Sequence, residues 1–228
     1  MANFCSDVPW QVLWRETRQG KSIGRILSNW VLTKWRGEIK GTVLDLACGL
    51  KPSYRRILDI EANSTCVHLV GVDHNIAYRP QVIADLTQGL PFKDSIADTV
   101  ILWNFLYIPE NPVEVLREVR RVVKDRGILL LTVPLLFPYN PEPTDYWRFT
   151  EEGVRYLLQH AGFSVENLVA IGGRWTSVAY LLSPFLRPRW LIPPFVYWLC
   201  LRLDRWTTRR FPYLAPCPIG YVVKARRL

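Results

Sequence analysis

The chain has 228 residues, of which 49% are hydrophobic and 21% are charged, a composition that excludes an intrinsically disordered protein. Its five cysteines are an odd number, without a CxxC pair or a nearby histidine cluster, which argues against a disulfide framework and against a metal site. The chain starts without a basic-then-apolar leader, so we expect it to be cytoplasmic rather than secreted.

The net charge of +9 is unevenly distributed along the chain. Residues 1–40 carry a net +4, residues 41–173 a net −4, and residues 174–228 a net +9, with Asp204 as the only acidic residue of that last segment. Eight of the ten tryptophans lie in the two basic segments. The sequence therefore predicts a mildly acidic central unit between two flanks that are rich in tryptophan and arginine.

Residues 1–40 are predicted to form an N-terminal helical cap, because 10–36 is amphipathic. Residues 41–173 then alternate between short apolar runs, which predict buried strands, and helical patterns. The predicted strands are 42–47, 67–73, 81–85, 98–103, 127–133 and 163–173. Strands that alternate with helices predict an α/β fold with a mostly parallel sheet, which binds ligands at the carboxyl ends of its strands.

The segment 174–216 is an apolar and basic insert between the last two predicted strands, and residues 217–228 return to the core as the final strand. Prolines and arginines interrupt the insert, so it lacks the roughly 20 consecutive apolar residues of a membrane-spanning helix. We expect two short helices there instead.

Three acidic residues, Asp45, Asp73 and Asp85, lie where the first three predicted strands end. In a parallel sheet these ends lie side by side above one crevice. A carboxylate after the second strand suits the two ribose hydroxyls of either NAD or S-adenosylmethionine (SAM).

The turn after the first strand distinguishes these two ligands. A pyrophosphate needs the pattern GxGxxG, whereas the corresponding positions here are Ala47, Gly49 and Pro52. SAM carries an ammonium, a carboxylate and a sulfonium group but no phosphate. Asp45 complements its cationic part, and the small Ala47 and Gly49 allow the backbone to approach. The turn therefore favours SAM.

On these motifs the segment 41–170 resembles the class I SAM-dependent methyltransferases, in their small type 11 branch. VLDLACGLKPS resembles the first motif in its CGxKP variant, and the later signatures follow in order as VGVD, ADLTQGLPFKDSIADTVILW, PVEVLREVRRVVKDRGILLLTVP, DYWRFT and AGFSVE. The resemblance implies a Rossmann-like fold with a seven-stranded, mostly parallel sheet, an antiparallel last strand and helices on both faces. It also implies SAM as cofactor and S-adenosylhomocysteine as product.

The resemblance further implies a set of cofactor-binding residues. It assigns the methionine-side loop to Asp45, Leu46, Ala47, Cys48 and Gly49, the ribose to Asp73 and His74, the adenine to Asp85 and Leu86, and the closure of the pocket to Trp103 and Asn104. No metal ligand is implied.

Two positions depart from the pattern of these relatives. They often carry histidines where this chain has Tyr107 and Asn140, so no histidine is an obvious base. Methyl transfer is a direct displacement that mainly needs positioning, and a base helps when the acceptor is a hydroxyl. The remaining catalytic candidates are Asp145, Tyr146 and Tyr107.

The basic, aromatic flanks have three interpretations. They could form a helical lid with snorkelling arginines, attach to an anionic membrane surface through 174–216, or bind nucleic acid. Nucleic-acid binding is the weakest interpretation, because the insert is too apolar for a solvated RNA-binding face.

The favoured function is a SAM-dependent methyltransferase acting on a small-molecule, lipid-linked or glycan-linked acceptor. In the second interpretation of the flanks, it acts at the inner face of the membrane. The alternatives are a catalytically altered scaffold or membrane-associated binding module and, third, an RNA methyltransferase.

Overall fold

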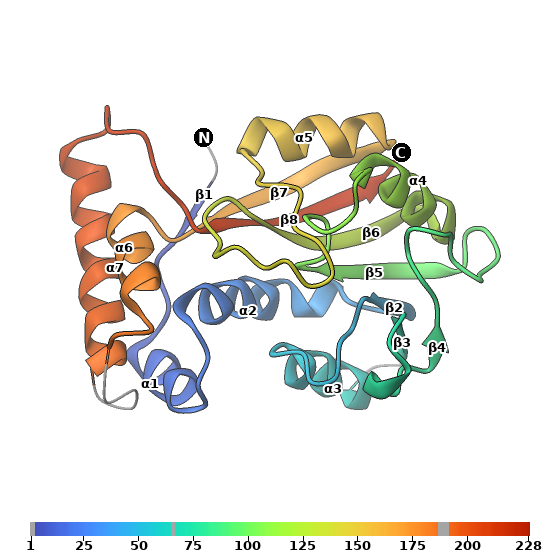
Figure 1. Ribbon diagram of the computed structural model, residues 1–228, viewed down its shortest axis with the longest axis horizontal. Coiled ribbons are helices and arrows are strands. Elements are labelled where there is room, and N and C mark those ends of the chain that lie inside the picture. Colours follow the sequence, from blue (N-terminus) through green and yellow to red (C-terminus); the bar gives the residue numbers. More distant parts are fainter. Residues whose placement is uncertain (1–2, 65–66, 187–191) are drawn as a thin grey trace.

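A single β-sheet lies at the centre of the computed structural model, which describes residues 3–64, 67–186 and 192–228 (Figure 1). The described strands are β1 (Asn3–Cys5), β2 (Thr42–Leu46), β3 (His68–Asp73), β4 (Val82–Ile83), β5 (Ala97–Trp103), β6 (Val123–Pro134), β7 (Phe163–Ile171) and β8 (Gly220–Arg227). Their order in the sheet is β1-β7-β8-β6-β5-β2-β3-β4, and β8 runs antiparallel to both of its neighbours while the other pairs are parallel. Cys66 and Trp190, which the sequence analysis counted, lie outside the described residues.

The helices form two layers on the sheet and a separate group at one end. The described α-helices are α1 (Trp10–Arg18), α2 (Ile23–Trp35), α3 (Arg55–Ser64), α4 (Pro112–Val122), α5 (Glu151–His160), α6 (Arg174–Leu182) and α7 (Ile192–Arg210), and 3₁₀ turns lie at Arg36–Glu38 and Ile76–Tyr78. Figure 1 shows α4 and α5 on one face of the sheet and α1, α2 and α3 on the other. Helices α6 and α7 pack on each other beyond the sheet, and α7 also contacts α1.

The predicted α/β fold, with a mostly parallel sheet and an antiparallel last strand, is confirmed. The sheet has one strand more than the seven predicted, because Asn3–Cys5 pairs in parallel with residues 169–171 of β7. The additional strand lies in the segment 1–40, before the amphipathic stretch 10–36 on which the prediction of a helical cap was based. A three-residue strand is too short to show an alternating pattern in the sequence.

The strands bury both faces, which explains their nearly continuous apolar sequences. Leu44 and Leu46 of β2 pack in the core under α4 and α5, whereas Val43 packs in the core under α2 and α3. Because side chains alternate along a strand, Asp45 points to the same side as Val43. The position of Asp45 in the layer beneath α2 and α3 is thus fixed by its place in the apolar run.

The insert forms a pair of helices, as predicted, although α7 is 19 residues long. Asp204 of α7 is buried, and its carboxylate accepts hydrogen bonds from the backbone N–H groups of Gly173 (3.0 Å), Trp175 (2.8 Å) and Thr176 (3.0 Å). These donors at the first turn of α6 would otherwise lack partners, so the one acidic residue of the insert joins its two helices. Among the described residues, none of the helices combines the length and the apolar character needed to cross a bilayer.

Candidate active site

A large cleft of about 1170 Å³ lies at the carboxyl ends of the central strands; we call it the large cleft. The residues of the predicted site that line it are Ala47, Gly49, Asp73, His74, Asp85, Asn104, Tyr107 and Tyr146. The carboxyl ends of parallel strands are where this type of sheet binds ligands. Side chains that are up to 99 positions apart in the sequence thus meet in one hollow.

The turn after β2 is bent into the large cleft by left-handed backbone. Ala47 has a φ of +53° and Gly49 a φ of +63°, and the left-handed conformation costs a non-glycine residue about 1 kcal/mol or more. The backbone N–H of Cys48 donates to Val72 O (3.1 Å), and that of Gly49 donates to Asp73 Oδ2 (2.9 Å). These two bonds to the neighbouring strand hold the turn in place.

Asp73 lies at the end of β3 and is only 3% exposed. Besides the bond from Gly49, its Oδ1 accepts from the backbone N–H of Asn75 (3.0 Å), and His74 Nδ1 lies 3.3 Å from the same oxygen. A carboxylate has about four acceptor sites, so each oxygen keeps capacity for one more donor from the large cleft.

Asp85 is exposed on the wall of the large cleft that follows β4. Its Oδ1 accepts from both the backbone N–H (2.9 Å) and the hydroxyl (2.8 Å) of Thr87. These bonds fix the orientation of the carboxylate without covering it. Leu86, the next predicted residue, is buried behind Asp85 in the apolar core.

Six of the predicted residues do not line the large cleft: Asp45, Leu46, Cys48, Leu86, Trp103 and Asp145. Asp45 lies wholly beneath the turn, with no exposed surface. Its Oδ1 accepts a hydrogen bond from Tyr54 Oη (2.8 Å), and its Oδ2 has no partner among the described residues. Burial raises the pKa of Asp45 to about 7, against the opposing effect of the Tyr54 hydrogen bond. This carboxyl therefore changes its protonation near neutral pH.

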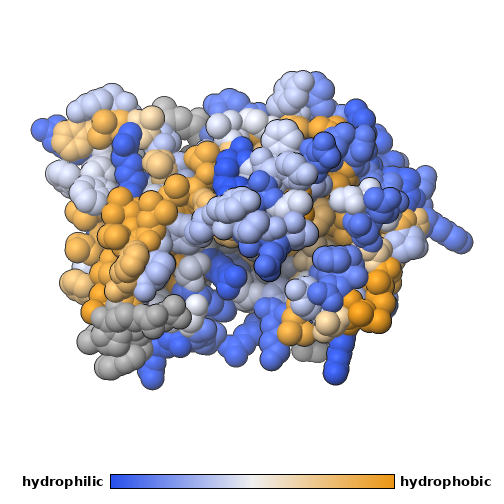
Figure 2. Space-filling view, in the orientation of Figure 1, coloured by the Kyte–Doolittle hydropathy of each residue, from blue (hydrophilic) through white to orange (hydrophobic). Residues whose placement is uncertain are grey.

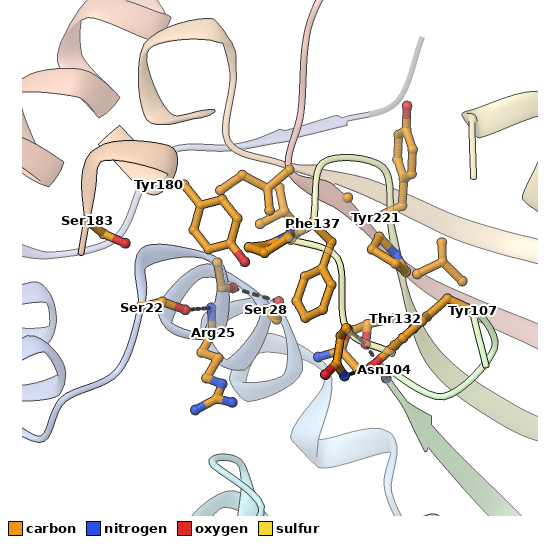
Figure 3. A pocket seen from close by; sticks show the side chains of 18 of the residues that line it. Ser22, Arg25, Ser28, Asn104, Tyr107, Thr132, Phe137, Tyr180, Ser183 and Tyr221 are labelled. Atoms are coloured by element: carbon orange, nitrogen blue, oxygen red, sulfur yellow. Dashed lines mark hydrogen bonds between the residues drawn. The ribbon is translucent and has the colours of Figure 1, made fainter. Parts of the chain in front are cut away.

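A second hollow of about 480 Å³, which we call the side cavity, lies between the carboxyl ends of β5, β6 and β7 and the flanking helices α2 and α6. Its walls include Ser28, Trp103, Phe137, Asn140, Tyr180 and Tyr221. Figure 3 shows Tyr180 and Phe137 near the middle of this hollow, with Asn104 and Tyr107 at one end. Trp103, which was expected to close the cofactor pocket, lines the side cavity instead.

Three residues line both hollows: Arg25, Asn104 and Tyr107. Asn104 directly follows β5 with a left-handed φ of +53°. Its backbone N–H donates to Thr132 Oγ1 (2.8 Å), and the same hydroxyl donates to Asn104 Oδ1 (3.0 Å). The boundary between the large cleft and the side cavity is thus held by polar groups at the ends of β5 and β6.

The two positions that depart from the family pattern are in direct contact. Asn140 Nδ2 donates to Tyr107 Oη (3.1 Å), and the Tyr107 ring packs on Phe137 with 5.5 Å between ring centroids. Tyr107 is only 5% exposed. Its hydroxyl is therefore fixed at the boundary of the two hollows.

The other two catalytic candidates have different surroundings. The Asp145 carboxylate binds the Arg148 guanidinium through both oxygens and accepts from the backbone N–H of Asn140 (2.9 Å). Arg148 is the main reason that the pKa of Asp145 falls to about 2, so this carboxylate stays ionised and holds its loop together. Tyr146 is 55% exposed at the rim of the large cleft.

The two hollows differ in charge. The large cleft is lined by Asp73, Asp85, Glu110, Glu114 and Glu142 against Arg25 and His74. The side cavity has no carboxylate among its described lining residues, and Arg25 is its one charged group there. The described part of the chain also contains no cluster of three or more histidine, cysteine or acidic side chains placed to hold a metal ion.

Sequence reasoning did not find the walls that the flanks contribute. Arg25 and Ser28 come from α2, and Tyr180 comes from α6. No motif marks these residues, because they reach the site only through packing of helices on the sheet. The one available signal was the high aromatic content of both flanks.

A family model described as "Methyltransferase domain" matches residues 44–131, which run from β2 to β6 and include most of the large cleft. The sequence matches none of the curated proteins with which it was compared.

Solved structures with the same fold cover most of the chain. A SAM-dependent methyltransferase from Archaeoglobus fulgidus has a TM-score of 0.56 at 17% identity, over 89% of this chain and 94% of that one. A geranyl diphosphate C-methyltransferase from Streptomyces coelicolor has a TM-score of 0.56 at 11% identity, over 88% and 75% of the two chains. The cyclase SpnF has a TM-score of 0.53 at 20% identity, over 86% and 80%.

The comparisons agree with the motifs on two points. Residues 44–131 match the methyltransferase domain that the motifs predicted, and the solved structures share the Rossmann-like α/β fold of the chain. The finer CGxKP subgroup stays a prediction.

The buried Asp45 generates a prediction about stability and pH. Between about pH 4 and 7 the folded protein keeps a proton on Asp45 that the unfolded chain has released, so raising the pH destabilises the fold. Relative to Asp45→Asn, the free energy of unfolding of the wild type should fall by about 1.4 kcal/mol per pH unit across this range.

Urea unfolding at several pH values measures this difference. The control is Asp59→Asn, which changes a half-exposed carboxylate paired with Arg55 and should give a profile parallel to the wild type. Parallel profiles for wild type and Asp45→Asn would show that Asp45 does not titrate in this range.

Proposed function

We propose that this enzyme binds SAM in the large cleft and transfers its methyl group to a small-molecule acceptor bound in the side cavity. The observation that carries this proposal is the junction of the two hollows at Arg25, Asn104 and Tyr107. SAM supplies the electrophilic methyl group and the leaving group. The contribution of the protein is then to orient the acceptor atom toward that methyl group and to exclude water.

The residues of the large cleft fit SAM. The bent turn at Ala47 and Gly49 offers its backbone to the methionine part, and Asp73 offers two carboxylate oxygens to the ribose hydroxyls. Asp85 suits the exocyclic amine of adenine. The exposed Arg25 is the candidate partner for the carboxylate of SAM, and the excess of acidic side chains suits the net positive charge of the cofactor.

At the acceptor end, Tyr107 is the favoured catalytic residue of the three candidates. The Tyr107 oxygen accepts a hydrogen bond from Asn140. The Tyr107 O–H group is therefore free to donate a hydrogen bond to an oxygen or nitrogen of the methyl acceptor and so to orient it. Asp145 is better suited to positioning, because it fixes Asn140 and Arg148. Tyr146 is the candidate lid residue over the large cleft.

A second candidate function is a protein that keeps the cofactor site but does not transfer a methyl group. Tyr107 and Asn140 favour it, since both stand where relatives often carry histidine. The structural neighbour SpnF is a [4+2]-cyclase, so a similar fold also carries another activity. Formation of S-adenosylhomocysteine with any acceptor would eliminate this alternative.

The assignment of Asp73 is testable by calorimetric titration with S-adenosylhomocysteine. Asp73→Ala removes the acceptor for the ribose hydroxyls and for the Gly49 N–H, and should weaken binding by about 1–3 kcal/mol, or roughly fivefold to 150-fold. Asp59→Ala, on the outer helix α3, serves as the control and should bind like the wild type. Equal affinity of Asp73→Ala and the wild type would contradict the ribose assignment.

We further propose that the segment 174–216 attaches the enzyme to an anionic membrane surface and that the acceptor is lipid-linked. Large apolar side chains are exposed on both helices and just after α6: Trp175, Val178, Leu181 and Leu182 of α6, Phe185 beyond its end, and Ile192, Phe195 and Leu199 of α7. Figure 2 shows apolar residues gathered over this end of the molecule. Large apolar side chains exposed on neighbouring helices are typical of interfacial attachment.

The second half of α7 supplies the matching positive charge. A third hollow, on the surface of this half of α7, is lined by Arg202, Arg205, Trp206, Arg209 and Arg210. The Arg202 guanidinium lies 5.3 Å from the Trp198 ring centroid. Asp204 does not neutralise this group, because its carboxylate points to the first turn of α6. Each arginine near an anionic leaflet contributes about 1 kcal/mol.

Vesicle flotation tests the membrane proposal. The protein should float with phosphatidylcholine vesicles that contain phosphatidylglycerol, and the variant Phe185→Asp/Phe195→Asp should lose most of this binding. The control Ile76→Asp changes an equally exposed aliphatic residue (72% exposed) at the opposite end of the sheet and should float like the wild type. Failure of the wild type to float with anionic vesicles would refute the proposal.

A further inference from the structure

We propose that the C-terminal end of α6 is a passage through which an apolar tail of the acceptor leaves the side cavity, so that the acceptor is an amphiphile with its reacting polar group inside and its tail at the surface. This inference rests on the proposed function of the side cavity as the acceptor site. It adds a tail-binding site and a residue, Leu181, that selects for the tail.

Leu181 belongs to both the cavity wall and the surface. It lines the side cavity and is 52% exposed. Pro184 has the same two properties, since it is exposed and also lines the side cavity. Both side chains thus border the side cavity and are exposed at the end of α6, which is where the proposed passage lies.

The surface next to this opening is apolar. Val178 of α6 and Phe185, which follows the C-terminal end of this helix, are 50% and 79% exposed. A tail that emerges past Leu181 therefore remains in contact with apolar side chains instead of entering water at once. The same helix thus offers one face to the side cavity and another to the exposed apolar surface.

Polar side chains lie at both ends of the side cavity. In Figure 3, Tyr180 and Ser183 lie on the α6 side, and Asn104, Thr132 and Tyr107 lie on the opposite side. The end with Asn104 and Tyr107 is shared with the large cleft. A bound amphiphile consequently places its polar head at the junction with the cofactor and its tail at α6.

A homologous series of n-alkyl β-D-glucosides, from pentyl to octyl and below micelle-forming concentrations, provides the probe. Calorimetric titration is carried out on the full chain saturated with S-adenosylhomocysteine. Burial of each added methylene should strengthen binding about fourfold in the wild type. A glucoside head tests the tail site without requiring the true acceptor.

The matched pair Leu181→Asp and Leu182→Asp separates the cavity from the exposed apolar surface. Both positions carry leucine, both are half exposed, and only Leu181 lines the side cavity. Leu181→Asp should abolish the dependence on chain length, whereas Leu182→Asp should retain it. S-adenosylhomocysteine should bind both variants as it binds the wild type. If circular dichroism shows that Leu181→Asp is unfolded, Leu181→Trp, which narrows the passage, replaces it.

Affinities that do not rise with chain length in the wild type would overturn the inference, as would equal effects of the substitutions at 181 and 182. The assignment of SAM to the large cleft can fail independently of the tail site. A protein that shows the chain-length dependence and its loss in Leu181→Asp, but does not bind S-adenosylhomocysteine, would retain the tail site and refute the proposed use of the large cleft.

Discussion

The hydrogen bond from the Gly49 N–H to the Asp73 carboxylate joins the ends of β2 and β3, and the geometry of the site depends on it. It holds the turn after β2 in a left-handed bend at Ala47. The bend brings the backbone of this turn to the wall of the large cleft, which Ala47 and Gly49 line. Asn104, which follows β5, also has a left-handed backbone and lines the same cleft. The two bends lie on adjacent strands and border one hollow.

The two hollows are built from different parts of the chain. The large cleft belongs mostly to the central unit, which the sequence predicted as acidic, and it is lined by five carboxylates. The side cavity depends on α2 and α6, which come from the two basic flanks. Asp204 holds the outer wall in place by capping α6 from α7. The flanks therefore complete the site as well as exposing an apolar surface.

Sequence patterns predicted the sheet and one side of the site because they reflect local rules. Asp73 and Asp85 follow apolar runs, so their place at strand ends could be predicted from the chain alone. Asp45 and Trp103 show the limit of this reasoning. The apolar runs of parallel strands hide which face each side chain takes, so nothing local predicted that Asp45 would be buried and that Trp103 would face the side cavity. Arg25 and Tyr180 required tertiary packing, which no local pattern reports.

The most direct test of the central claim is a crystal structure of the enzyme with S-adenosylhomocysteine. We expect the adenosine to lie against Asp73 and Asp85, and the sulfur to lie at the junction formed by Asn104 and Tyr107, facing the side cavity. A sulfur atom that points away from the side cavity, or a cofactor bound outside the large cleft, would contradict the claim.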